Sequence, residues 1–133
     1  MGAVAFPLRF DRRFQLWSYN VSHGVLLLRS NRTGGSPTRV DLMFRAVTEI
    51  RLRHRISDLS LDNVDEDGDA LFRLGIQDRG DRHVFLISSE EFDDGYVVAG
   101  SMYMSEDDLS DGEPSSIDDD DLADRVIRSG YFQ

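Results

Sequence analysis

Cysteine and lysine are both absent from this chain of 133 residues. The absence of cysteine excludes disulfides, thiolate metal ligands and thiol nucleophiles. The absence of lysine excludes Schiff-base chemistry and the phosphate-binding lysine of a P-loop. All 15 basic residues are therefore arginine, and the domain has to be stabilised by packing and polar contacts alone.

Long hydrophobic runs are also missing, because no apolar stretch approaches the ~18 residues that suggest a membrane span. Residues 1–10 lack the basic start and long apolar stretch of a secretory signal. We therefore expect a cytoplasmic protein without a membrane span. A content of 40% hydrophobic and 30% charged residues in this length predicts one globular domain.

Charge is divided unevenly along the chain. Residues 1–60 contain ten arginines and four acidic residues, a net charge of +6, whereas residues 61–133 contain five arginines and 21 acidic residues, a net charge of −16. Such asymmetry indicates an electrostatic contact between the halves, between copies of the chain or with another molecule. The alternative is that a basic sheet and an acidic tail both simply face water, since exposed ion pairs contribute only ~0–1 kcal/mol each.

Residues 39–56 alternate between apolar and polar side chains. Apolar residues occupy most even positions and arginines many odd ones, and this period of two is typical of a half-buried strand. A strand of this length would be unusual, so we expect a break near residues 46–48. Residues 41–54 also fit the spacing of an amphipathic helix, and this alternative stays open at the sequence level.

Other segments also favour strands. Residues 10–21 and 25–29 predict a first hairpin, followed by a surface loop over residues 31–38. Residues 71–76, with Phe72, Leu74 and Ile76 inward, and residues 83–87 predict a second hairpin. Residues 96–104 predict a strand in which Gly100 marks a bulge or a close backbone approach.

The end of the chain is strongly acidic. Residues 105–116 have the low hydrophobicity and high charge of a flexible linker. Residues 117–129 predict a short helix with Ser116 as N-cap and Gly130 after its end. The expected fold is mainly β (α+β): a β-rich domain over residues 1–104, built as a single antiparallel β-sandwich or half-open barrel, then the linker and the helix.

The order of these elements resembles the pleckstrin-homology and GRAM group of small barrels. The matching segments are residues 24–29 (GVLLLR), 40–52 (VDLMFRAVTEIRL) and 71–87 (LFRLGIQDRGDRHVFLI), which cover about half of the chain. The resemblance implies a half-open sheet closed by a helix, and a binding scaffold without chemistry of its own.

Arginines provide the main candidate site. Alternate positions on a strand project from one face about 6.6 Å apart, and guanidinium groups bind carboxylates and phosphates bidentately. The candidate partner-binding residues are Arg39, Arg45, Arg51, Arg53 and Arg55. We predict a non-enzymatic interaction module whose arginine face contacts an acidic protein surface, a second copy in a homo-oligomer, or the chain's own acidic tail. The alternative is binding of phosphate-bearing ligands or nucleic acid, although the net charge of −10 disfavours nucleic acid.

Evidence for metal or catalytic chemistry is weak. Asn63, Asp65 and Asp67 resemble the start of a calcium loop, but Leu74 stands where a bidentate glutamate is required. His23, His54 and His83 lack metal-ligand spacing, and His54 falls on the apolar phase, which predicts a buried imidazole. No metal or cofactor is therefore expected, and a small hydrolase with a histidine-centred site is the last alternative.

Overall fold

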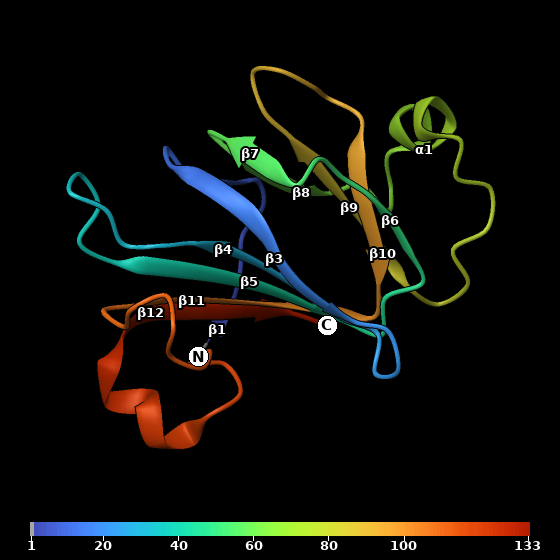
Figure 1. The fold of residues 1–133 in the computed structure, drawn as a ribbon. Coiled ribbons are helices and arrows are strands. Elements are labelled where there is room, and N and C mark those ends of the chain that lie inside the picture. The colour runs from blue at the N-terminus through green and yellow to red at the C-terminus, as the bar shows by residue number, and fades with distance from the viewer. Residues whose placement is uncertain (1) are drawn as a thin grey trace.

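Two β-sheets with a shared hydrophobic core build the fold (Figure 1). The computed structural model describes residues 2–133. In order across the first sheet lie seven strands: β1 (Gly2–Ala3), β12 (Val126–Phe132), β11 (Ser101–Asp107), β5 (Arg39–Arg45), β4 (Val25–Ser30), β3 (Arg13–Asn20) and β7 (Arg55–Ser57). The second sheet has five: β2 (Leu8–Arg9), β8 (Ser60–Asn63), β9 (His83–Ser88), β10 (Gly95–Ala99) and β6 (Glu49–Arg51). All strand pairs within residues 2–133 are antiparallel except β1 with β12, so the prediction of a mainly β fold with sandwiched sheets is confirmed.

The alternating stretch forms strands, as its period predicts. Its first part is β5, in which Val40, Leu42 and Phe44 are fully buried. These side chains pack with Phe85 and Ile87 of β9 in the core between the sheets. The helical alternative for residues 41–54 is wrong, because a helix would turn half of these apolar side chains away from the core.

The expected break in this stretch is the place where the chain changes sheet. β5 ends at Arg45 and β6 begins at Glu49 in the other sheet, with Ala46 at a positive φ of 55° between them. The return crossing at Gly100, between β10 and β11, touches the same corner, since a Cβ on Gly100 would lie 3.0 Å from the Cβ of Ala46. The close approach predicted for Gly100 is therefore confirmed, and a larger residue would push the two crossings apart.

The predicted first hairpin is present as β3 and β4. Its register shifts between Leu16 and Ser18, which places Trp17 at a β-bulge. Because a bulge inserts an extra residue and turns its strand, Trp17 departs from the strict alternation of its neighbours and remains 39% exposed.

The predicted second hairpin is wrong in its first half. Residues 68–74 form helix α1 (Gly68–Leu74), and only the second half is a strand, β9. The Asp67 carboxylate accepts a hydrogen bond from the Ala70 N–H, and Gly75 ends the helix in the left-handed conformation, so capping at both ends outweighs the alternation of residues 71–76. Phe72, predicted to point inward, is 88% exposed.

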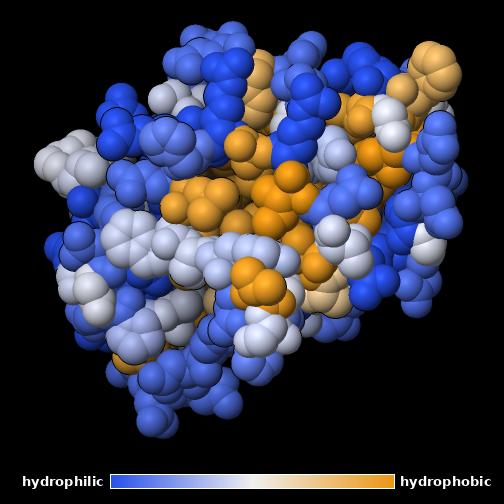
Figure 2. All heavy atoms as spheres, turned by 45° about the vertical axis from the view of Figure 1, so that its right-hand side comes forward, coloured by the Kyte–Doolittle hydropathy of each residue, from blue (hydrophilic) through white to orange (hydrophobic). Residues whose placement is uncertain are grey.

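A second, smaller hydrophobic cluster lies between α1 and the outer face of β9 and β10. It contains Val64, Ala70, Val84 and Val98, with Leu86 partly buried against them. Figure 2, which brings this side of the molecule forward, shows hydrophobic residues in one continuous area bordered by hydrophilic ones. The helix therefore covers part of the five-stranded sheet, and the rest of that face stays open.

The predicted C-terminal helix over residues 117–129 is present only in part, and the predicted N-cap at Ser116 is wrong. The chain forms a short 3-10 helix, η1 (Asp120–Arg125), whose N-cap is Asp119, and then enters β12. β12 pairs with β11 along its length, and its last residue, Phe132, packs on the core. An isolated helix of this length is only marginally stable in water. Pairing with the open edge of β11 satisfies the backbone N–H and C=O groups of both strands.

Residues 105–116 also differ from the flexible linker that their composition predicts. Residues 105–107 belong to β11, and Ser105, Asp107, Leu109, Ser115 and Ser116 are buried. In Figure 1 the segment between β11 and β12 forms a lobe beside the seven-stranded sheet, away from β6, β9 and β10. Within residues 2–133, no helix is long and apolar enough to cross a membrane.

Candidate functional site

The outer face of the seven-stranded sheet, turned away from the core, carries buried charges. Arg29 on β4 donates two hydrogen bonds to the Asp41 carboxylate on β5, at 2.7 and 3.0 Å. Arg39 lies on the same face of β5, with one of its nitrogens 3.8 Å from Asp41. As odd-numbered residues of the alternating stretch, Arg39 and Asp41 were expected to face water, yet both are 0% exposed. The expectation fails because a later segment of the chain covers this face.

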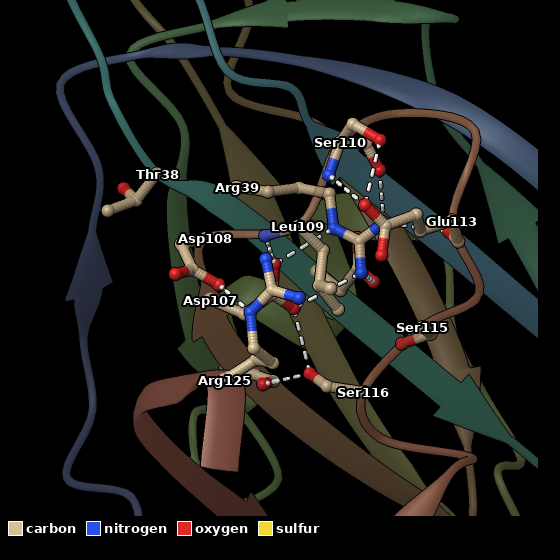
Figure 3. Close-up of polar contacts among 12 residues, drawn as sticks. Thr38, Arg39, Asp107, Asp108, Leu109, Ser110, Glu113, Ser115, Ser116 and Arg125 are labelled. Atoms are coloured by element: carbon tan, nitrogen blue, oxygen red, sulfur yellow. Dashed lines mark hydrogen bonds and ion pairs between the residues drawn. The ribbon is translucent and has the colours of Figure 1, made fainter. Parts of the chain in front are cut away.

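Arg39 is the centre of the contact between the sheet and that segment (Figure 3). Two of its N–H groups donate to the carboxylate of Asp107, at 3.1 and 3.2 Å. Three more donate at 2.8 Å to the backbone carbonyls of Ser110, Glu113 and Pro114. A guanidinium group has five N–H donors, and here every one has an acceptor.

The Asp107 carboxylate has further partners. It accepts a hydrogen bond from the Ser116 hydroxyl at 2.8 Å and another from the backbone N–H of Leu109 at 3.0 Å. The Ser116 and Ser105 hydroxyls lie 2.6 Å apart, as Ser116 returns to the strand that carries Asp107. These bonds join both ends of the loop after β11 to one carboxylate.

The four central charges balance. Two arginines and two aspartates alternate across neighbouring strands, in the order Arg29, Asp41, Arg39 and Asp107. Removal of ions from water is costly, and a buried pair compensates for this cost only when its geometry is good and all its hydrogen bonds are made. A complete network of this kind specifies one position for the covering loop, because any other position would leave buried charges without partners.

Other arginines bind the same acidic segment at its edges. The guanidinium of Arg29 donates to the Asp111 carbonyl at 2.9 Å, and that of Arg32 to the Asp108 carbonyl at 3.0 Å. Arg45 donates to the Asp118 carboxylate at 2.7 Å, and its guanidinium lies over the Tyr103 ring. The acidic segment of residues 108–118 is thus held on the arginine-bearing face of the sheet.

A groove of about 700 Å³ lies between this segment and the turn end of the β3–β4 hairpin. Its apolar surface comes from Trp17, Val25, Leu27 and Met43, and its polar rim includes His23, Asp111, Glu113 and Asp118. Hydrogen bonds from the backbone N–H and the hydroxyl of Ser110 lower the pKa of Glu113, so this rim carboxylate stays ionised at neutral pH. The groove combines an aromatic wall with negative charge.

The five candidate arginines do not form one stripe. Arg39 and Arg45 contact residues 107–118, as described above. Arg51 on β6 and Arg53 just after it belong to the other side of the molecule and lie near the β9–β10 turn, where Arg51 donates to Asp94 at 2.9 Å and Arg53 lies 3.8 Å from Glu91. Arg55 is exposed on β7, at the edge of the seven-stranded sheet. The break at Ala46 sends the later arginines to other strands, so one continuous arginine-lined face does not exist.

The calcium-loop candidates have structural partners instead. Asp67 caps α1, and the Asn63 amide N–H contacts the Val84 carbonyl at 3.4 Å. Asp65 accepts the Val84 N–H at 2.7 Å and lies 2.6 Å from Nδ1 of His83. Burial raises the pKa of Asp65, but these hydrogen bonds, a further one from Asn63 and the charge of Arg79 lower it overall. Within residues 2–133, no group of three His, Asp or Glu side chains is arranged to hold a metal ion.

The three histidines lie apart from one another. His23 is in the β3–β4 turn beside Asn20 and Ser22, and His83 pairs with Asp65 at the start of β9. His54 is exposed, so the prediction of a buried imidazole is wrong. His54 lies between β6 and β7, outside any strand, so the period of two does not fix the direction of its side chain.

Sequence reasoning missed Trp17, Arg29 and Asp107. Arg29 did carry a signal, since a charged residue directly follows the three leucines of a strand, which is unusual unless a partner is present. Trp17 and Asp107 carried none, because the bulge and the covering loop depend on strand pairing far along the chain.

No protein-family model, no curated protein and no solved structure matches this chain.

Proposed function

We propose that this chain is a non-enzymatic interaction module. Its arginine-bearing sheet face binds the chain's own acidic segment and so displays a fixed acidic surface to a cationic partner. The observation that carries the proposal is the contact of Arg39, whose five N–H groups all bind residues 107–114. Of the three contacts considered for the arginine face, this observation favours the one with the chain's own acidic tail.

Charge supports a cationic partner. The lobe of residues 108–125 contains eight acidic side chains and one arginine, and Asp120, Asp121 and Asp124 are exposed on it. An acidic partner or a second copy that used Arg39 would first have to displace the bound segment. The exposed side chains of this lobe therefore carry a net negative charge. This charge attracts cations over a distance of about one Debye length.

The test is a titration of the purified full chain with fluorescein-labelled oligo-arginine and oligo-glutamate peptides at low and high salt. We expect oligo-arginine to bind with an affinity that falls steeply with salt, and oligo-glutamate not to bind. A triple variant of the lobe, Asp120→Asn with Asp121→Asn and Asp124→Asn, should weaken oligo-arginine binding several-fold.

The matched control removes the same charge from the α1 side through Glu66→Gln, Asp69→Asn and Asp81→Asn, three exposed residues. Equal effects of the two triple variants would show that binding depends only on the net charge of the chain. That result would contradict the proposal that the lobe is a specific binding surface. Binding of oligo-glutamate would restore the acidic-partner form, and binding of oligonucleotides or phosphorylated peptides through Arg51, Arg53 and Arg55 would favour the anion-binding alternative. The resemblance to pleckstrin-homology and GRAM domains stays a prediction.

A further inference from the structure

We infer that the groove beside Trp17 is the docking site for a cationic peptide segment of a partner protein, one apolar side chain of which inserts against the indole. This inference rests on the proposed function and names the part of the acidic surface that gives specificity.

Trp17 is suited to an anchor role. It lies at the bulge of β3, is 39% exposed and lines the groove. Its indole packs against the guanidinium of Arg29, 5.1 Å from the ring centroid, and Arg29 is itself fixed by two bonds to Asp41. A rigid, partly exposed tryptophan in a concave site is the residue type most often found at the energetic centre of protein interfaces.

The groove offers apolar contact below this ring. Leu27 and Met43 form its floor, and Val25 lies partly exposed beside them. A single inserted leucine or isoleucine side chain would lose much of its contact with water there. The opposite wall is residues 111–115, whose backbone is fixed by Arg39 and Arg29, so the groove is formed before any partner arrives and little ordering entropy opposes binding.

The charges of the groove select a cationic segment. Of the carboxylates on the rim, Asp118 is paired with Arg45, whereas within residues 2–133 no side chain binds the carboxylate of Asp111. The one arginine that lines the groove, Arg29, is neutralised by Asp41 and donates a third hydrogen bond to the Asp111 carbonyl. The carboxylates of this rim would repel an acidic segment, whereas a basic segment could pair with the carboxylate of Asp111.

The experiment uses two blocked peptides, Gly-Arg-Arg-Leu-Arg-Arg-Gly and the same sequence with Ser in place of Leu. Trp17 is the only tryptophan in the chain, so its emission and its quenching by acrylamide report directly on the groove. We expect the Leu peptide to bind roughly tenfold more tightly than the Ser peptide, to shift the Trp17 emission and to protect it from acrylamide. Asp111→Asn should weaken both peptides, and Asp69→Asn, a change of the same type at an exposed residue of α1 that does not line the groove, should not.

Trp17→Ala has no tryptophan emission, so its binding of the two peptides is measured by isothermal titration calorimetry. This variant should lose the preference for Leu and keep the salt-dependent binding of both peptides. Tyr19→Ala is the matched control, because Tyr19 is an aromatic residue of the same strand with the same 39% exposure and does not line the groove. Circular dichroism checks that both variants fold, and the acrylamide measurement on the unmodified chain tests the inference without any variant.

The outcomes separate the two proposals. Equal binding of both peptides with unchanged Trp17 emission would overturn the docking site and leave the proposed function intact. Failure of both peptides to bind would overturn the proposed function and the docking site together. A concentration-dependent change of Trp17 emission without peptide would assign the groove to a second copy of the chain and overturn the peptide site, as would a preference for Leu that survives in Trp17→Ala.

Discussion

Arg39 and Arg53 come from the same alternating stretch, yet their surroundings have little in common. Arg39 is 0% exposed and donates five hydrogen bonds. The Arg53 side chain is 58% exposed, lies 3.8 Å from Glu91 and covers the Phe92 ring. The difference shows that a period of two assigns a side chain to a face of a sheet, whereas the rest of the chain decides whether that face meets water.

The largest effect is expected for Arg39→Ala. Its loss leaves the buried Asp107 carboxylate without its charged partner and three partly buried carbonyls without their donor. Removal of one partner of a buried pair costs about 3–5 kcal/mol. Urea denaturation followed by circular dichroism measures the change in the free energy of unfolding.

Arg39→Lys serves as the companion variant. It keeps the charge but has three donors in place of five, so its stability should lie between those of the unchanged chain and Arg39→Ala. A change below about 1 kcal/mol in Arg39→Ala would show that the network does not anchor the acidic segment.

The second prediction compares single and double replacement of the Arg29 and Asp41 pair. Asp41→Leu alone leaves the guanidinium of Arg29 buried without its ion pair. Arg29→Met alone leaves the Asp41 carboxylate with only the 3.8 Å contact to Arg39. The double variant removes both charges, so it should be at least about 2 kcal/mol more stable than either single variant. A double-mutant cycle in urea measures this coupling, and additive single effects would argue against a buried pair.

The third prediction concerns the stability of the fold at acid pH and the contribution of Glu106. The exposure of Glu106 lies between that of Arg39 and that of Arg53. Burial raises its pKa, but hydrogen bonds from Thr38 and Arg128 and the charges of Arg128 and Arg12 lower it below the ordinary value of 4.5. A folded-state pKa below the unfolded value adds stability above that value, and this contribution disappears as the pH falls through the folded-state pKa.

The difference in unfolding free energy between the unchanged chain and Glu106→Gln should therefore be constant near neutral pH. It should shrink once the pH falls below about 4.5. Urea midpoints measured across this range supply the comparison. Parallel curves for the two proteins would mean that Glu106 titrates alike in the folded and unfolded states.

The smallest effects are expected at the exposed end of the comparison. Arg51→Ala and Arg53→Ala each break a pair between side chains that are about half exposed or more, and exposed pairs contribute about 0–1 kcal/mol. Thermal unfolding at low and high salt should show shifts near the error of the measurement that vanish with salt. A loss of stability as large as that of Arg39→Ala would show that the exposed pairs of Arg51 and Arg53 matter as much as the buried contacts of Arg39.

The pattern of residue types along the chain predicted those parts of the fold that depend only on residues close together in the sequence. The even positions of residues 40–44 point into the core as their period requires, and the break at residues 46–48 follows from the limited length of strands. The first hairpin and the close approach at Gly100 were also predictable from the residue types.

Residues 71–76 and 117–129 show where local patterning fails. The first segment alternates, but the cap at Asp67 and the stop at Gly75 make residues 68–74 a helix. The second has helix signals, but β11 offers an open edge and β12 forms on it. In both cases two structures were locally acceptable, and contacts with distant residues selected one of them.

The candidate site was only half predictable for the same reason. The sequence alone determined a mainly β chain, a basic first half and an acidic second half, because periodicity and charge are properties of the residues themselves. The tertiary structure decided that the acidic segment covers the arginines of β4 and β5, that Arg39 is buried and that Trp17 lines a groove. Those outcomes depend on which strands become neighbours across the sheet. A charge that water and salt would screen at the surface requires a partner once it is buried.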